Sequence, residues 1–246
     1  MLRKILNKIY KITKALIQGF GWYGRDFLHY RSLLKKAGDK ETIKLFPQIF
    51  DRDPDSHTFD KHYVYMDRWA LKQLVRKTPS VHVDVGSSIR FLSMASVITR
   101  VKFVDIRPIK TDFDNFECIE GSILSMPFPD NSVNSLSCLH VAEHIGLGRY
   151  GDPLDIEGTK KSCLELKRVL AVGGSLYFAL PIGKPAVYFN AHRVHNPEVI
   201  LEYLKGLTLK SFSVVNDAGN YIEKANIQDY INANYACGCF EFVKEI

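Results

Sequence analysis

The stretch that most constrains the fold runs from Val81 to Asp105. It opens with a short β-branched run that ends at Val85, which predicts a buried strand. Gly86 ends this strand, and apolar residues then recur at helical spacing up to Arg100. A second apolar run follows and ends on Asp105. This order of strand, tight turn, helix, strand and acid predicts one unit of a parallel α/β sheet, whose ligands lie beyond the carboxyl ends of the strands.

The residues at the two strand ends favour a nucleoside ligand. Gly86 lets ligand atoms approach the backbone, the next helix offers unpaired N–H groups, and Asp105 can accept both hydroxyls of a ribose. Only one glycine stands where a dinucleotide fingerprint has three. Asp84 disfavours a pyrophosphate at this turn and suits a ligand that carries positive charge. S-adenosylmethionine, with its ammonium and sulfonium groups, therefore fits the sequence better than NAD does.

Length and composition predict a large domain behind an N-terminal extension. The chain has 246 residues and is 46% hydrophobic, which is enough for a substantial core. We expect the extension to cover residues 1–60 and the main domain residues 61–246. The five cysteines are scattered, which disfavours a disulfide framework or a metal site and favours a reducing cytoplasm. No apolar run is long enough for a transmembrane helix, and lysines interrupt the N-terminal apolar positions, so no signal peptide is expected.

Positive charge is concentrated at the N-terminus. Residues 1–36 hold nine Lys or Arg and one acid, a balance of +8 against a net charge of +6, so the remaining 210 residues carry −2. The charge of the main domain therefore argues against a nucleic-acid-binding surface. Residues 1–20 predict a basic amphipathic helix, residues 19–24 a break, and residues 25–37 a second helix. The first helix either contacts the anionic inner face of the membrane, or packs on protein, including a second copy in a homo-oligomer.

The alternation of strands and helices continues to the end of the chain. Further strands are predicted at residues 116–119, 132–139, 175–180, 207–215 and 236–244. Helices are predicted at residues 62–77, 158–170 and 196–205. Strands that alternate with helices are typical of a doubly wound sheet.

The order of these segments resembles the class I S-adenosylmethionine-dependent methyltransferases. Residues 83–86 are similar to their first motif, residues 103–105 to their ribose-binding motif and residues 121–130 to their adenine-side loop. Residues 142–145 and 166–174 resemble the segment after the fourth strand and the turn into the fifth. The resemblance implies a Rossmann-like sheet of seven strands with the last one antiparallel, S-adenosylmethionine as cofactor, and methyl transfer as the activity.

Two positions depart from that pattern. Ser87 and Ser88 stand where the first motif has further glycines, and Ser122 stands where an acid usually contacts the adenine. A narrower resemblance is to the family of domain of unknown function 268, carried by residues 84–89, 105–108 and 143–152. Members of that family occur among bacterial surface-polysaccharide genes. The resemblance therefore implies a sugar acceptor, either in a surface polysaccharide such as a capsule or in its nucleotide-linked precursor.

These resemblances and the chemistry of the side chains select the candidate site residues. The predicted cofactor-binding residues are Asp84, Gly86, Ser87, Ser88, Asp105, Ile106, Gly121, Ser122, Ile123 and His140. A hydroxyl acceptor needs a base, and histidine suits neutral pH. The candidate base is His144, with His140 and Glu143 as rivals. The predicted acceptor-binding residues are Arg149, Asp152, His192, Arg193 and His195. Asp152 and Asp155 have side chains that a divalent metal accepts, but spacing alone does not select one, so no metal is predicted.

Two other functions compete with methyl transfer. The first is a non-catalytic methyltransferase-like protein that binds a partner enzyme through its basic N-terminal helices. The second is a nicotinamide-dependent sugar oxidoreductase. The single glycine of the first turn, and the lack of a Tyr-x-x-x-Lys pair beside a catalytic serine, count against the oxidoreductase.

Overall fold

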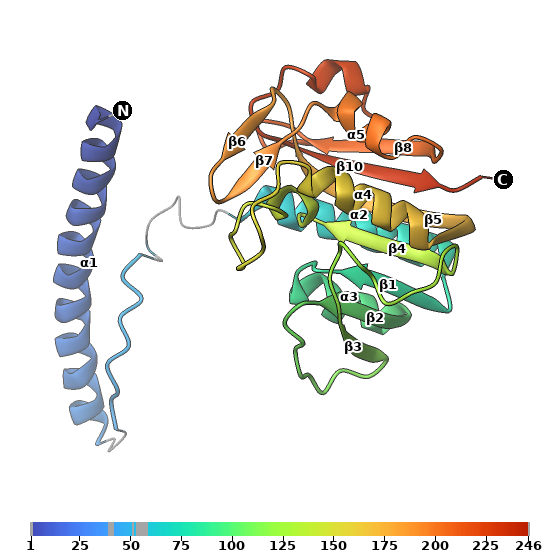
Figure 1. The fold of residues 1–246 in the computed structure, drawn as a ribbon. Helices are drawn as coiled ribbons and strands as arrows, with labels where there is room; N and C mark the ends of the chain where they lie inside the picture. The colour runs from blue at the N-terminus through green and yellow to red at the C-terminus, as the bar shows by residue number, and fades with distance from the viewer. Residues whose placement is uncertain (1, 39–41, 51, 53–58, 246) are drawn as a thin grey trace. The chain divides into compact units, whose positions relative to one another are not determined.

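The computed structural model describes the chain except for residues 1, 39–41, 51, 53–58 and 246 (Figure 1). The chain separates into two compact units, residues 1–59 and residues 60–246.

The first unit is built on one long helix, α1, which spans Leu2–Ala37 (Figure 1). The predicted break at residues 19–24 is therefore wrong. Gly19 is buried inside the helix, and a Cβ there would lie 2.7 Å from the Cβ of Ile49. This glycine thus allows the extended segment before Ile49 to pack closely on α1. The helix continues through the other glycines because each costs only about 1 kcal/mol relative to alanine.

The second unit contains an eight-stranded sheet in the order β3-β2-β1-β4-β5-β10-β8-β9. The strands are β1 Val81–Val85, β2 Arg100–Asp105, β3 Phe116–Glu120, β4 Val133–Leu139, β5 Leu170–Ile182, β8 Thr208–Val215, β9 Tyr221–Ile222 and β10 Ala236–Val243. The strands β1 to β5 run parallel to one another, and β10 runs antiparallel to both β5 and β8. The doubly wound sheet with an antiparallel last strand is confirmed. The predicted number of seven strands is wrong, because the two-residue edge strand β9 is too short to show a period in the sequence.

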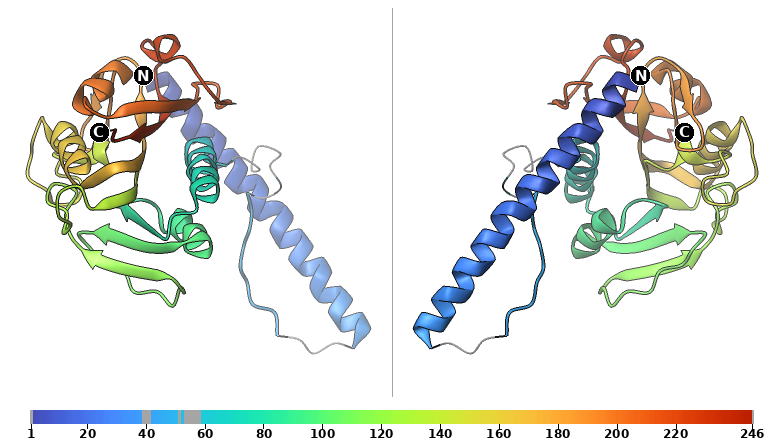
Figure 2. Two further views of the ribbon diagram at one scale, coloured as in Figure 1. Left: turned by 90° about the vertical axis from the view of Figure 1, so that its right-hand side faces the viewer. Right: turned by 90° about the vertical axis from the view of Figure 1, so that its left-hand side faces the viewer.

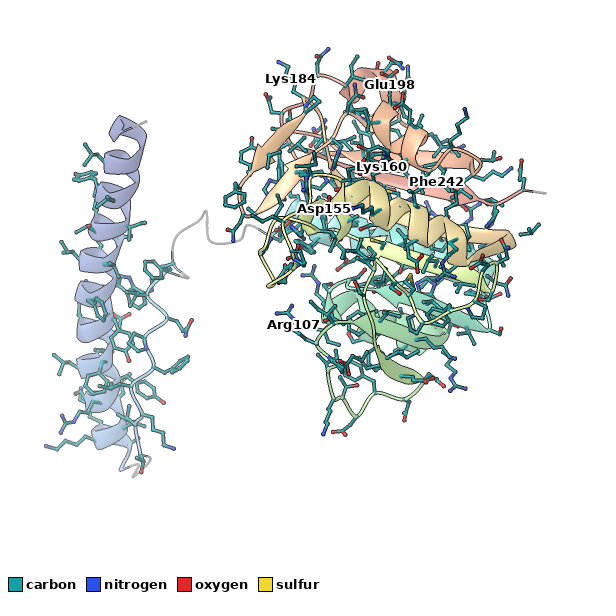
Figure 3. All side chains as sticks on the ribbon, viewed as in Figure 1. Arg107, Asp155, Lys160, Lys184, Glu198 and Phe242 are labelled. Atoms are coloured by element: carbon teal, nitrogen blue, oxygen red, sulfur yellow. The ribbon has the colours of Figure 1, made fainter. Side chains whose placement is uncertain are left out.

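Helices cover both faces of this sheet (Figure 2). They are α2 Lys61–Lys77, α3 Ile89–Ile98, α4 Gly158–Val169 and α5 Pro197–Tyr203, with short 3₁₀ turns at Ala142–His144 and Ile227–Tyr230. Apolar side chains of α4 and α5 pack with one face of the sheet in one core cluster. Side chains of α2 and α3 pack with the other face in a second cluster, and together the two clusters fill the space on both sides of the strands (Figure 3). A separate hairpin joins β6, Ala186–Tyr188, to β7, His192–Val194.

A buried carboxyl closes the turn between β1 and α3. Asp84 is fully buried and accepts hydrogen bonds from the backbone N–H of Ser87 at 3.1 Å and from its hydroxyl at 2.7 Å. The hydroxyl of Ser137 on β4 donates to the same carboxyl. On its other side this hydroxyl lies 2.8 Å from Nε2 of His82, which is also fully buried. The network thus joins β1, its turn and β4 at the edge of the sheet where a ligand would approach.

Gly86 takes the next position in that turn and requires a glycine for two reasons. Its φ of +70° lies in the left-handed region that side chains disfavour. A Cβ at this position would also lie 2.8 Å from Cγ1 of Val141, in the segment after β4. The turn therefore lies directly against the segment that follows the fourth strand.

We expect Gly86→Ala to destabilise the protein more than Gly173→Ala does. Gly173 also has a positive φ, +78°, but a Cβ there meets no atom within 4 Å. Both variants should lose about 1–2 kcal/mol to the left-handed backbone. Only Gly86→Ala should lose a further amount of about 1–3 kcal/mol through the contact with Val141. Urea unfolding measures both free energies. Val141→Ala added to Gly86→Ala should recover part of the loss, and equal losses in the two single variants would contradict the close approach.

The buried Asp84 carboxyl should make stability depend on pH. Burial raises the pKa of Asp84 from 3.8 to about 7, although the hydrogen bonds from Ser137 and Ser87 oppose the rise. The folded state therefore binds this proton more tightly than the unfolded state. The contribution of Asp84 to the free energy of unfolding is present below pH 3.8 and is lost as the pH rises to about 7. The loss should be on the order of a few kcal/mol.

Asp84→Asn tests this expectation, because the amide cannot ionise and can still accept from the N–H of Ser87. Urea unfolding at a series of pH values should show a weaker pH dependence in this variant than in the wild type. Asp114→Asn makes the same chemical change at an exposed position before β3 and should leave the wild-type dependence in place. If Asp84→Asn keeps the full dependence, the carboxyl does not hold its proton in the folded state.

Candidate functional site

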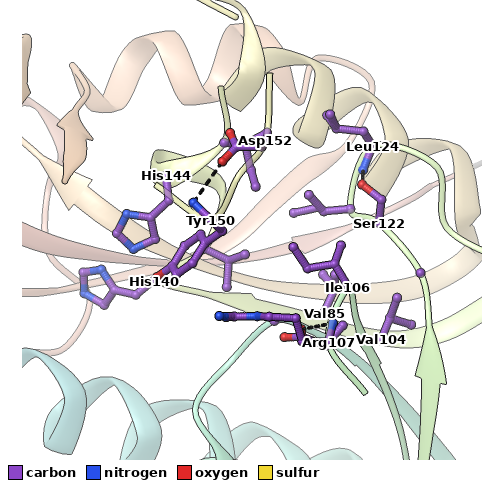
Figure 4. Close-up of a pocket in the computed structure, with 16 residues that line it drawn as sticks. Val85, Val104, Ile106, Arg107, Ser122, Leu124, His140, His144, Tyr150 and Asp152 are labelled. Carbon is purple, nitrogen blue, oxygen red and sulfur yellow. Dashed lines mark hydrogen bonds between the residues drawn. The ribbon is translucent and has the colours of Figure 1, made fainter. Parts of the chain in front are cut away.

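A first cleft lies beyond the carboxyl ends of β1, β2, β3 and β4 (Figure 4). It is lined by Val85, Gly86, Val104, Asp105, Ile106, Arg107, Gly121, Ser122, Ile123, Leu124, His140, Val141, His144, Ile145, Tyr150 and Asp152. Seven of the ten predicted cofactor-binding residues are among them: Gly86, Asp105, Ile106, Gly121, Ser122, Ile123 and His140. The walls are largely aliphatic, and the polar groups come from the ends of strands and the loops that follow.

Asp105 stands at the end of β2, where its carboxyl remains partly exposed. One carboxyl oxygen accepts a hydrogen bond of 2.7 Å from the backbone N–H of Arg107. This bond orients the side chain, and no hydrogen bond to the other oxygen is recorded among the described residues. Across the cleft, the Ser122 hydroxyl accepts from the N–H of Leu124 at 3.1 Å, which shapes the loop after β3 (Figure 4).

The loop after the fourth strand forms one side of the cleft. Asp152 folds this loop by accepting from the N–H of Gly146 at 2.6 Å and from the N–H of Tyr150 at 3.2 Å. Partial burial would raise the pKa of Asp152, but these backbone hydrogen bonds outweigh it and lower that pKa. Two cations lie close to the ring of Tyr150, with the guanidinium of Arg107 at 4.9 Å and that of Arg149 at 5.1 Å from its centroid.

A second cleft, which we call the histidine cleft, adjoins the first. It is lined by Asp60, Lys61, His62, Tyr63, His140, Glu143, His144, Arg149, His192 and Tyr235. Almost every one of these side chains is polar or charged, in contrast to the first cleft. His140 and His144 line both clefts. The two histidines therefore stand where the aliphatic cleft and the polar cleft meet.

His144 is held with one ring nitrogen available. Its Nδ1 lies 2.6 Å from the carbonyl oxygen of Ala191, so Nδ1 carries the proton and donates it to that carbonyl. The guanidinium of Arg149 donates to the same carbonyl at 3.2 Å. Nε2 is then left as an acceptor, with a carboxyl oxygen of Glu143 3.8 Å away. This is the arrangement that a general base needs.

His140 is engaged differently. It has a φ of +56° and follows β4, with its N–H donating to the carbonyl of Ala179 at 2.8 Å. Its Nδ1 lies 2.7 Å from Oε1 of Glu143, whose side chain is fully buried. Burial opposes a charge on His140, but Cys237 and the Glu143 carboxylate outweigh it and raise the pKa of His140 well above its usual range. Glu143 is thus bound to His140 and is poorly placed to accept a proton from a ligand.

Five predicted site residues line neither cleft, and their hydrogen bonds show what they do instead. Asp84 and Ser87 are sealed in the turn after β1, and Ser88 caps α3 by accepting from the N–H of Phe91. Arg193 donates to the carbonyls of Ile145 and Asp155 at 2.5 and 2.8 Å, so it braces a loop. His195 lies 3.1 Å from the Thr159 hydroxyl, and burial lowers its pKa to about 4. The remaining acceptor-site candidates, Arg149, Asp152 and His192, each line one of the clefts.

Sequence reasoning missed several residues that line the clefts. Arg107 and Tyr150 lie inside the segments that carry the family resemblance, so those segments could have identified them. His62 and Tyr63 come from the first turn of α2, and Tyr235 comes from the approach to β10. No local pattern marks these three, because they join the site only when α2 packs on the sheet and β10 pairs with β5.

Comparisons with known proteins agree with this fold. A Galdieria sulphuraria protein provisionally assigned as a sarcosine dimethylglycine methyltransferase is 14% identical, over 87% of this chain and 97% of its own, with a TM-score of 0.55. The N-methyltransferase NodS of Bradyrhizobium japonicum WM9, solved with S-adenosyl-L-homocysteine, is 13% identical over 80% and 90%, with a TM-score of 0.51. The cyclase SpnF is 14% identical over 73% and 82%, with a TM-score of 0.52. These likenesses establish the fold of the class I methyltransferases.

No curated protein matches the sequence. The family described as "Caenorhabditis protein of unknown function, DUF268" matches residues 113–235, which is half of the chain. That range includes the loop after β3, both histidines shared by the clefts, and Tyr235. The chain therefore belongs to the DUF268 family, and it has the fold of the class I methyltransferases.

Proposed function

We propose that this protein is an S-adenosylmethionine-dependent methyltransferase that acts on a hydroxyl group of a small sugar or nucleotide-sugar. The observation that carries the proposal is the meeting of the two clefts at His140 and His144. An aliphatic cleft with an acid at the end of β2 suits a nucleoside donor. A polar cleft that opens beside it suits a hydroxylated acceptor. The proposed location is the cytoplasm.

The first cleft has the groups that such a donor requires. The carboxyl of Asp105 can accept both ribose hydroxyls, and Gly86 leaves room for a ligand against the backbone. Ile106, Ile123 and Leu124 supply apolar surface for a planar base. A solved structure with this fold, NodS, contains S-adenosyl-L-homocysteine. When bound, S-adenosylmethionine would supply a methyl group to an acceptor oxygen in line with its sulfur.

The histidine cleft would hold the acceptor. Arg149, Lys61 and His192 offer donors to hydroxyl or phosphate oxygens, and Asp60 offers an acceptor. The proposed sugar belongs to a surface polysaccharide or capsule. This part of the proposal is supported by the resemblance to the family of domain of unknown function 268, whose members occur among surface-polysaccharide genes. In the reaction, Nε2 of His144 takes the hydroxyl proton while the Ala191 carbonyl holds Nδ1–H in place. The loop folded by Asp152 places the ring of Tyr150 at the same junction.

We also propose that α1 supports contact with an anionic membrane surface, with packing against a second copy as the alternative. Apolar side chains of α1 are exposed in the structure: Leu6, Ile9, Ile12, Ile17 and Phe20. Within the described residues, no helix has a stretch both long and apolar enough to cross a membrane. Contact would therefore be made by the helix lying at the surface.

Asp105→Ala should weaken the binding of S-adenosylhomocysteine. Removal of a charge-assisted bidentate interaction should cost about 2–3 kcal/mol, which is roughly a 30- to 150-fold rise in Kd. Calorimetry on the wild type and the variant measures the change, with NAD as a parallel ligand. Asp114→Ala removes an exposed acid outside the cleft and should bind like the wild type. Unchanged binding in a folded Asp105→Ala protein would contradict the donor site, and preferential binding of NAD would favour an oxidoreductase.

His144→Ala should keep donor binding and lose turnover by roughly 10²–10⁴-fold. The reason is that the variant lacks the nitrogen that accepts the hydroxyl proton, while the walls of the first cleft remain. Nucleotide-sugars would be screened first as acceptors, with methyl transfer detected by the change in mass. His29→Ala, an exposed position on α1, is the matched control. Retained turnover would exclude His144 as the base, and loss of donor binding as well would indicate a structural role.

A further inference from the structure

Three metal-ligating side chains converge at the inner end of the histidine cleft. They are His62 in the first turn of α2, His140 after β4, and Cys237 at the start of β10. A ring nitrogen of each histidine and the sulfur of Cys237 all lie within 4.8 Å of one another. Within the described residues, no other three metal-ligating side chains lie so close together. The three come from elements far apart in sequence, so the fold brings them together.

The orientation of His140 favours a ligand at its second nitrogen. Nδ1 is committed to the Glu143 carboxylate at 2.7 Å, which fixes the proton on Nδ1. Nε2 is buried and has no nitrogen or oxygen partner within the described residues, and the ring interacts with the side chain of Cys237. His140 itself is only 8% exposed. Metal-binding histidines in proteins characteristically donate their other N–H to a carboxylate in this way.

The other two groups complete a site of matching chemistry. The Cys237 side chain is fully buried, and the His62 ring stacks between those of His140 and Tyr235, with centroids 5.7 and 5.0 Å away. Two imidazoles and a thiolate are the donors that zinc prefers. The thiolate and the neighbouring Glu143 carboxylate together would balance the two positive charges of the ion. Oε1 of Glu143 is held by His140, but the buried Oε2 has no hydrogen-bond partner within the described residues, so a nearby cation would offset the cost of burying it.

We propose that His62, His140 and Cys237 bind one Zn²⁺ ion, and that the fourth ligand position opens to the histidine cleft. Ligands of a tetrahedral zinc lie about 3.3–3.8 Å apart, so the side chains would close by about 1 Å on binding. Cys237 binds as the thiolate and His140 through an unprotonated Nε2, and the protons that these two atoms carry are released to solvent. A site with three protein ligands and one open position is the form in which zinc meets a water or a substrate oxygen. The proposal goes beyond the methyltransferase assignment and stands without it.

The ion would have a consequence for the two shared histidines. With Nδ1 on Glu143 and Nε2 on the metal, His140 has no nitrogen left to accept a proton. His144 then remains as the base at the junction, and an acceptor oxygen in the histidine cleft could lie beside the ion. The metal would also join the start of α2 to the end of β4 and the start of β10.

Titration of the full-length chain with Co²⁺, after treatment with a chelator, tests the site directly. Co²⁺ takes the place of zinc and reports its ligands in its absorption spectrum. We expect visible bands of tetrahedral cobalt, a thiolate-to-cobalt charge-transfer band, and loss of both when Zn²⁺ is added. Cys237→Ser should lose the charge-transfer band, whereas Cys118→Ser, a half-buried thiol on β3, should keep it. His62→Ala should weaken binding of the ion, whereas His29→Ala should not.

Glu143→Gln provides a test of the orienting carboxylate and should weaken Zn²⁺ binding by roughly 10- to 100-fold. X-ray absorption at the zinc edge of the wild-type protein, which needs no variant, should show one sulfur and two imidazole ligands. A cobalt complex without a sulfur band, or Zn²⁺ bound as tightly by folded Cys237→Ser as by the wild type, would overturn the proposal. If Cys237→Ser does not fold, the X-ray absorption spectrum decides, and a zinc shell without sulfur would refute the site.

Discussion

The buried hydrogen bonds of Asp84 are the interaction on which the rest of the site depends. This carboxyl holds the N–H and hydroxyl of Ser87 and the hydroxyl of Ser137, so it joins the turn after β1 to β4. The turn then presents Gly86 beneath Val141, and both residues form the floor of the first cleft. Burial of a carboxyl is costly unless it is hydrogen-bonded. The hydrogen bonds that satisfy the Asp84 carboxyl are also the ones that hold the turn against β4. Asp84, the acid of the first motif, therefore influences the ligand site indirectly, by fixing the backbone of the turn that lines the first cleft.

The junction of the two clefts is organised by a second buried carboxylate, that of Glu143. It lies between His140 and His144, at 2.7 Å from a nitrogen of the first and 3.8 Å from a nitrogen of the second. The Ala191 carbonyl, on the hairpin before β7, takes the other nitrogen of His144. The two histidines consequently present different atoms to the clefts. His144 has the geometry of a base, and His140 has the geometry of a residue held in place for a ligand.

Membership of the DUF268 family does not by itself specify a reaction, since the family is described as having unknown function. The fold does not specify a reaction either, because SpnF, a cyclase, shares it with NodS, an N-methyltransferase. The proposal of methyl transfer therefore depends on the site: Asp105 at the end of β2, aliphatic walls, and a polar cleft reached through His144. The cations Lys61 and Arg149 in that cleft are what a phosphorylated or acidic acceptor would contact.

The sequence by itself determined the features that local patterns encode. Apolar periodicity located β1, β2 and β4, and the glycine and acid at the strand ends located Gly86 and Asp105 in the first cleft. Tertiary structure decided the features that require contact between distant segments. Gly19 leaves room for Ile49 to pack on α1, and Arg193 on β7 faces the carbonyls of Ile145 and Asp155 because the loop after β4 lies beside β7. The group of His62, His140 and Cys237 exists for the same reason, since 174 residues lie between the first and the last. The packing of α2 on the sheet and the pairing of β10 with β5 bring them together.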